Sequence, residues 1–260
     1  WYSDIMKHAK YAEHRSYAAL KIKDLVLDKL TADQEFRAEL DSVESMSLLY
    51  SEDRDFRVFT MQKLNQQMEG QFSGFVQFKG GEVIPLKSSS SAAISESRYL
   101  PAGRWPGAVY EKLIEHKIDG KSYYILIGSA FESERSWRHI TEVFHLDNGM
   151  LKIGAPLFYH PERDFSKYRI SRSFMAGSGS SMHYIPKSDQ IVMDHLTTIS
   201  DPRTGAERQV PDGTYEVYKR KKDQWVYIEK ANSPLEKELK TGNTNPHKSN
   251  RDIFGRQREN

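Results

Sequence analysis

The sequence predicts a mainly β protein, an antiparallel and hairpin-rich meander preceded by an N-terminal helical segment. The first 45 residues contain neither Gly nor Pro, and their apolar residues recur at helical spacing. From about residue 46 the period of the pattern changes to two, and short turn sequences separate the alternating stretches. Strand order does not follow from these patterns. A sandwich, a barrel and a propeller-like meander therefore all remain open.

Residues 1–45 form the predicted helical segment. Charged residues fill the faces between the apolar positions, which is typical of one bent helix or two consecutive amphipathic helices. The sequence Thr31–Gln34 has the form of a capping box and predicts a further short helix over residues 32–40. We expect the helices to pack on the β body through one apolar stripe, although an arm that grips a partner has the same pattern. The apolar positions of the longer stretch are Ala18, Ile22, Leu25, Val26 and Leu30.

Residues 46–230 form the predicted β domain, with about ten to twelve short antiparallel strands. The best-supported hairpin turns at Asp119–Gly120, because strand-forming residues flank it and this dipeptide accepts positive φ angles. The run Tyr123–Ile127 is apolar on both faces, which predicts a central strand that is covered on both sides. Further turns are predicted at Gly80–Gly81, Asn148–Gly149, Pro186–Asp189, Asp212–Gly213 and Lys222–Asp223.

Residues 231–260 form a polar tail that we expect to be solvated or bound to a partner. The tail has six basic and four acidic residues, and this surplus of two equals the net charge of the whole chain. The β body is therefore close to neutral. Ile253 and Phe254 are the apolar pair in the tail that could anchor it on a partner.

Composition excludes several classes of function. Lys and Arg total 38 against 36 Asp and Glu, so the chain has no strong field for nucleic acid, even with the basic run after Tyr218. The chain has no cysteine, which excludes disulfides and thiolate metal sites. No apolar run reaches about 18 residues, so we expect no membrane-spanning helix in these residues.

Histidines and carboxylates provide the candidate chemistry, and we expect no cofactor. Asp194 and His195 are adjacent, but neighbouring side chains on a strand point to opposite faces unless a bulge intervenes. His183, on the preceding predicted strand, could face His195 as a metal pair, which would still need a third ligand. Glu111 and Glu115 would lie about 13 Å apart along a strand, too far for the paired acids of glycoside hydrolysis.

Aromatic side chains are the other candidates for binding. Most of them fit core positions and cross-strand pairs of a β protein. Trp105 is the exception, because it lies between Arg104 and Pro106 in a predicted loop, where a large ring is seldom needed. We therefore expect Trp105 to contact a ligand or a partner.

Several segments together resemble an uncharacterised family of exported proteins from Gram-negative bacteria. Met61 and Ser129 depart from that family, which tends to have Trp at both positions. The resemblance implies export, and hence a periplasmic, extracellular or envelope-associated location, but it implies no activity. The segments are Phe56–Gln62, Gly120–Tyr124, Ile153–Phe158, Ile191–Leu196 and Pro211–Tyr215.

The sequence thus favours a non-catalytic exported protein that binds another protein in a cell-envelope assembly. This expectation depends on the missing catalytic motifs, the neutral aromatic-rich body and the charged ends of the chain. The alternative is a glycan-directed hydrolase or carbohydrate-binding domain that uses loop aromatics and carboxylates brought together by folding.

Overall fold

The computed structural model describes residues 1–39, 45–88, 94–200 and 205–231. Ile253 and Phe254, the predicted anchor of the tail, therefore lie outside the described residues. The chain begins with two helices, α1 (Tyr2–His8) and α2 (Ala12–Ala32), and all the later regular elements are strands apart from two short 3-10 helices. The switch of sequence period near residue 46 coincides with the first strand, β1 (Met46–Tyr50).

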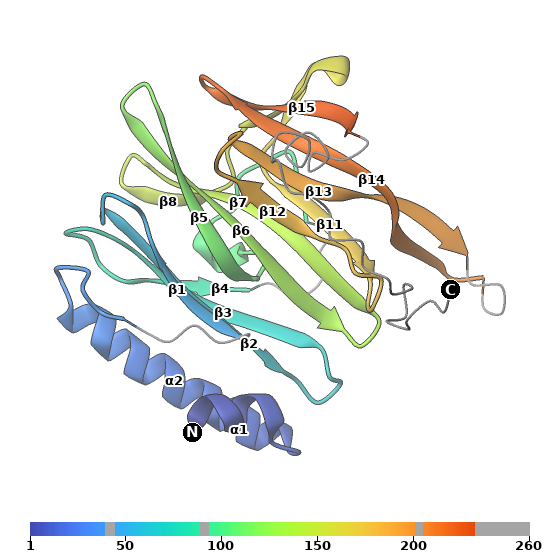
Figure 1. Ribbon diagram of the computed structural model, residues 1–260. Coiled ribbons are helices and arrows are strands. Elements are labelled where there is room, and N and C mark those ends of the chain that lie inside the picture. The colour runs from blue at the N-terminus through green and yellow to red at the C-terminus, as the bar shows by residue number, and fades with distance from the viewer. Residues whose placement is uncertain (40–44, 89–93, 201–204, 232–260) are drawn as a thin grey trace, which may run out of the picture.

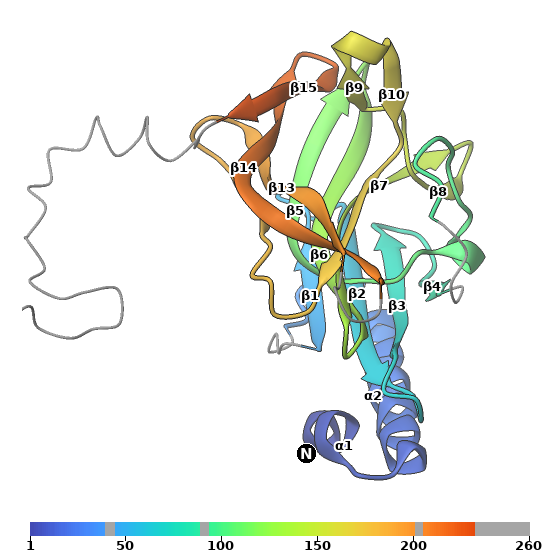
Figure 2. The same cartoon turned by 90° about the vertical axis from the view of Figure 1, so that its right-hand side faces the viewer.

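Three sheets stack face to face, and the two helices cover one outer side of the stack (Figures 1 and 2). The helix-side sheet has the order β1, β2 (Phe56–Leu64), β3 (Gly70–Phe78), β4 (Ile84–Lys87). The central sheet has the order β11 (Ile170–Met175), β7 (Ser136–Asp147), β6 (Lys121–Ser133), β5 (Val109–Ile118), and β8 (Met150–Ile153) also pairs with β7. The outer sheet has the order β10 (Phe165–Lys167), β9 (Phe158–His160), β15 (Gln224–Ala231), β14 (Glu207–Lys221), β13 (Gln190–Ser200), β12 (Met182–Ile185).

The predicted fold class is confirmed, and of its alternatives the sandwich-like stacking of open sheets applies. All strand pairs are antiparallel except the short pairing of β15 with β9. Neighbouring strands in the helix-side sheet are also consecutive in sequence, as a meander requires. No helix in the described part of the chain is both long and apolar enough to cross a membrane.

The helices and the helix-side sheet enclose the first of three buried clusters. Ile22, Val26 and Leu30 of α2 are buried against Phe59 and Phe75 of the sheet. The helical stripe predicted from the sequence therefore faces the β body. Leu25, which the pattern also assigned to this stripe, is instead 58% exposed, because it lies off the buried face of α2.

The second and third clusters lie on the two faces of the central sheet. Tyr124 and Leu126 pack toward the helix-side sheet, and Ile125 and Ile127 pack toward the outer sheet. The predicted two-sided coverage of the run Tyr123–Ile127 is thereby confirmed. Alternation along a single strand places consecutive residues in different cores.

Turn chemistry explains the hairpin between β5 and β6. Asp119 and Gly120 have φ angles of 49° and 76°, and they join Ile118 to its partner Lys121, so the predicted hairpin is confirmed. The turn predicted at Asp212–Gly213 is wrong, because this dipeptide lies inside β14. It forms an irregularity there, opposite the register shift between Asp194 and Leu196 of β13.

The helix predicted over residues 32–40 is also wrong, because α2 ends at Ala32. The Asp33 carboxylate accepts hydrogen bonds from the backbone N–H of Arg37 at 2.9 Å and of Ala38 at 2.7 Å, which closes a non-helical turn. Arg57 reaches the same carboxylate from β2 at 2.6 Å. A tertiary ion pair therefore holds Asp33 where the capping-box pattern would have started a new helix.

Candidate functional site

A cleft of about 710 Å³ opens between α1, β1 and the ends of strands from the two inner sheets. Met6 and His8 line it from α1, and Met46 and Leu49 line it from β1. On the side of the central sheet its walls include Val109, Tyr110, Phe131 and Trp137. Most of the lining is apolar, so the cleft can exclude water from an apolar ligand group.

The floor of the cleft is the point where the edges of the two inner sheets meet. The Ser47 hydroxyl on β1 donates to the backbone carbonyl of Tyr110 on β5 at 2.5 Å. The backbone N–H of Tyr110 donates in turn to Oγ1 of Thr60 at 3.1 Å. β5 has a register shift between Tyr110 and Lys112, just beyond this junction. The bulge redirects β5 and separates the two edges, which leaves room for the cleft.

One wall of the cleft is held by the Gln62 side chain, which forms hydrogen bonds with the backbone of β6. The Gln62 side-chain amide donates to the carbonyl of Phe131 at 2.9 Å and accepts from its N–H at 3.3 Å. Gly70 passes so close that a Cβ there would lie 1.9 Å from the same carbonyl oxygen. These contacts hold the ends of β2, β3 and β6 together beside the cleft.

Arg15 fixes the helices above the cleft. It is 4% exposed, and it donates to the carbonyls of Ala9 at 2.8 Å and Lys10 at 3.1 Å, where α1 gives way to α2. It also donates to the carbonyls of Leu64 at 3.0 Å and Asn65 at 2.7 Å, at the end of β2. A single guanidinium thus ties the helix junction to the sheet, which keeps α1 over the opening.

Polar side chains are interspersed with the apolar ones in the cleft; they are Lys7, His8, Ser45, Ser47, Gln62, Lys63, Glu111 and Ser129. Glu111 is the one carboxylate among the described lining residues, and the hydroxyl of Ser129 lies 3.5 Å from it. The Ser45 hydroxyl is buried and has no hydrogen-bond partner among the described residues. This arrangement suits recognition of an apolar group by shape, with Ser45 available to a polar atom of the ligand.

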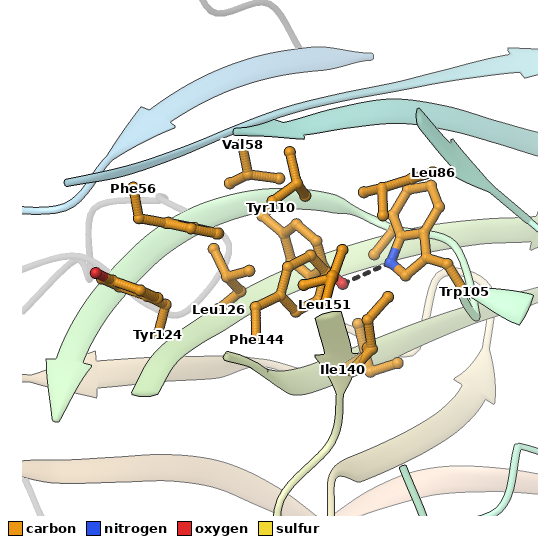
Figure 3. Packing of buried hydrophobic residues seen from close by; sticks show 13 residues of the cluster. Phe56, Val58, Leu86, Trp105, Tyr110, Tyr124, Leu126, Ile140, Phe144 and Leu151 are labelled. Carbon is orange, nitrogen blue, oxygen red and sulfur yellow. Dashed lines mark hydrogen bonds between the residues drawn. The ribbon is translucent and has the colours of Figure 1, made fainter. Parts of the chain in front are cut away.

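The prediction for Trp105 needs correction, because the ring is fully buried and cannot contact a partner in this conformation. Its indole N–H donates to the hydroxyl of Tyr110 at 2.8 Å, between the helix-side and central sheets (Figure 3). Phe72 packs edge-on against it with the ring centroids 6.4 Å apart. The loop that carries Trp105 enters the gap between the sheets, so the large ring fills core space.

The histidine candidates do not form a shared site. His183 is exposed, and its partner across the hairpin is Val192. His195 pairs instead with Asp212, with 2.8 Å between Nδ1 and Oδ2. Hydrogen bonds from Thr214, with a further contribution from His195, hold the pKa of Asp212 well below its usual value. The described ranges contain no group of three His, Asp or Glu side chains that could hold a metal ion.

Asp194 and His195 have different partners, although the strand has a register shift between Asp194 and Leu196. Asp194 accepts hydrogen bonds from the N–H of Ser181 at 2.6 Å and from its hydroxyl at 2.9 Å. The carboxylates of β5 are separate too. Glu111 lines the cleft, while Glu115 forms an ion pair with Lys117 at 3.1 Å.

Phe131 and Trp137 are the cleft residues that sequence reasoning missed. They are cross-strand partners beside the β6–β7 turn, and their rings meet edge-on at 5.2 Å. An aromatic residue on each side of a short polar turn was the available signal. It could not show that this turn lies next to α1, because that contact is made between distant parts of the chain.

Comparison of the chain with protein-family models, with curated proteins and with solved structures finds no match.

Proposed function

We propose that the protein is a non-catalytic, exported binding component of the cell envelope and that its cleft receives an apolar segment of a partner protein. One observation carries the proposal: a largely apolar cleft of about 710 Å³ opens beside the edges of two sheets. Pockets of roughly 300–1,000 Å³ with apolar walls are typical of specific ligand binding. The proposed envelope location depends on the sequence resemblance of segments such as Phe56–Gln62.

An extended peptide is the form of partner that fits this opening best. In the described structure β1 and β5 each have a strand neighbour on one side only. Met46 and Leu49 of β1 line the cleft, so a segment lying along the start of β1 could insert side chains between the sheets. Trp137 is half-buried at the cleft wall and can act as an aromatic anchor, a residue type that often dominates binding energy.

Filling the cleft tests the proposal. Tagged full-length protein and its Met46→Trp variant are used to capture partners from the envelope fraction of the source cells. Met46 lines the cleft, whereas Met150, 64% exposed on β8, provides a matched Met150→Trp control. We expect one protein that the wild type and Met150→Trp retain and Met46→Trp loses. Equal retention by all three folded proteins would contradict the proposal.

Glycan binding is the second candidate, and the pairing of Trp137 with Phe131 favours it. Aromatic faces stack on sugar rings, and Glu111 could accept hydrogen bonds from sugar hydroxyls. The described part of the cleft does not contain the pair of acids that hydrolysis needs, because Glu111 is the one carboxylate among its described lining residues. A saccharide that binds the wild type and is lost from Met46→Trp would select this candidate.

A further inference from the structure

A second hollow, which shares Lys63 with the cleft, lies between α2 and the helix-side sheet. Its volume is about 400 Å³. Lys23 and Ser16 of α2 face it from one side, and Lys63 of β2 and Ser73 of β3 face it from the other. Ser88 follows β4 and adds a third hydroxyl to its lining. The described lining residues thus contribute two ammonium groups, three hydroxyls and no carboxylate.

Lys63 supplies the first positive charge of this hollow. It is half-buried, and its ammonium donates to the hydroxyl of Ser16 at 2.9 Å, with no carboxylate within ion-pair distance among the described residues. Its nearest cationic neighbour is Arg15, whose four hydrogen bonds all go to backbone carbonyls. Burial lowers the pKa of Lys63, and repulsion from Arg15 lowers it further. An anion placed beside Lys63 would relieve both effects.

Lys23 supplies the second charge. It is half-buried on α2, and within the part of the chain that the structure describes no ion pair or hydrogen bond engages its side chain. Glu13 and Asp24, the acidic residues nearest in sequence to Ser16 and Lys23, do not line the hollow. The local charge in the hollow is therefore positive, although the whole chain has a net charge of only +2.

We infer that this hollow is a binding site for a tetrahedral oxyanion, a phosphate or sulfate group, held by Lys23 and Lys63 and by the hydroxyls of Ser16, Ser73 and Ser88. Ammonium groups attract the charge of such an anion, and hydroxyls donate to its several acceptor oxygens. A carboxylate offers two oxygens in one plane and matches donors from opposite walls less well. The group could belong to free phosphate or to a lipid headgroup. Although Lys63 lines both cavities, the inference uses the charges and hydroxyls of the hollow and not the apolar walls of the cleft, so it does not depend on the proposed function.

The first test is a calorimetric titration of the full chain with inorganic phosphate. A parallel test is a flotation assay with vesicles. The vesicles consist of phosphatidylcholine with or without phosphatidylglycerol. We expect Lys63→Gln and Lys23→Gln each to weaken binding about tenfold, the effect of losing one charged hydrogen bond. Lys112 is exposed on β5 and does not line the hollow. Lys112→Gln is therefore the matched control and should bind as the wild type does.

A further variant separates a loss of anion binding from a loss of folding, because it leaves Lys63 in place. Ser73→Asp retains both lysines but places a carboxylate in the hollow, so it should abolish anion binding while thermal unfolding stays near that of the wild type. If both phosphate and phosphatidylglycerol vesicles bind, and the variants change both affinities as expected, the site recognises the phosphate group that the two probes share. Binding of the vesicles alone would identify a lipid headgroup as the source. Failure of the wild type to bind either probe, or equal binding by all variants, would overturn the inference.

Discussion

The indole N–H of Trp105 donates a 2.8 Å hydrogen bond to the hydroxyl of Tyr110, and both side chains are fully buried between the helix-side and central sheets. The backbone of Tyr110 also accepts from Ser47 and donates to Thr60, at the floor of the cleft. The residue that the sequence placed on a loop for binding therefore supports the core beneath the site.

Replacing Trp105 should destabilise the fold. We expect Trp105→Ala to lower the free energy of unfolding by about 3–5 kcal/mol, as for other large-to-small core changes. The matched control is Trp1→Ala, because Trp1 is 79% exposed and its loss should cost less than about 0.5 kcal/mol. Urea unfolding followed by circular dichroism measures both. A Trp105→Ala variant as stable as the wild type would show that the ring is not a core element.

The ion pair of Arg169 with Glu142 should show strong coupling. Both side chains are fully buried, with 2.6 Å between Nε and Oε1. Arg169 also donates to the carbonyls of Ser95, Arg98 and Ile153, so it links a loop to the central sheet. We expect Arg169→Met to cost about 3–5 kcal/mol, because Glu142 would be left as an uncompensated buried charge.

The double variant Glu142→Leu/Arg169→Met provides the control for that charge. It should lose less stability than the two single variants added together, since it removes both charges at once. The unfolding midpoints of the wild type, the two single variants and the double variant complete the double-mutant cycle. Simple additivity would mean that the pair is not coupled.

Acid should destabilise the protein, and His160 should contribute to the effect. Burial, together with repulsion from Lys167, Arg163 and Arg172, lowers the pKa of His160 from 6.5 to about 4. Nε2 of His160 contacts the hydroxyl of Tyr218, and Phe165 stacks on the ring.

The unfolded chain takes up a proton at His160 near pH 6.5, whereas the folded chain resists it down to about pH 4. The stabilisation from neutral His160 is therefore complete above pH 6.5 and is lost as the pH falls through this window. We expect a loss on the order of 2 kcal/mol between these limits. His160→Gln should flatten the pH dependence of the urea midpoint, and His183→Gln should not. An unchanged slope in His160→Gln would contradict the assignment.

Gly70 should tolerate no side chain. A Cβ at Gly70 would lie 1.9 Å from the carbonyl oxygen of Phe131, which Gln62 also binds. Gly70→Ala should therefore separate the strand ends beside the cleft and lower stability by more than about 1 kcal/mol. Gly103→Ala is the matched control, because no atom lies within 4 Å of its Cβ position. Equal melting temperatures for the two variants would disprove the close contact.

Local sequence patterns correctly predicted those elements that are determined by residues adjacent in the sequence. The switch to a two-residue period near Met46 marks the start of the β body, and the apolar run Tyr123–Ile127 is a strand covered on both faces. The Asp119–Gly120 hairpin likewise follows from the positive φ angles that its turn requires. Each of these features depends on residues that are adjacent in the sequence.

The predictions that failed depend on distant partners. Arg57 of β2 engages Asp33 and helps to hold a turn in place of the expected helix. Gly213 has a positive φ of 86° at an irregularity inside β14, and the sequence alone could not distinguish this irregularity from a hairpin turn. The cleft was not predicted either, because it joins parts of the chain as distant as Met6 and Trp137.

Site-specific photo-cross-linking shows whether a partner segment lies in the cleft. A photoreactive amino acid replaces Met46 in the cleft or, as a control, Met150 on β8, and the full chain is irradiated in the envelope fraction. We predict that position 46 cross-links to an apolar stretch of one partner protein, mapped by mass spectrometry, and that position 150 does not. The same product from both positions, or none from position 46 while that protein is still captured, would contradict binding in the cleft.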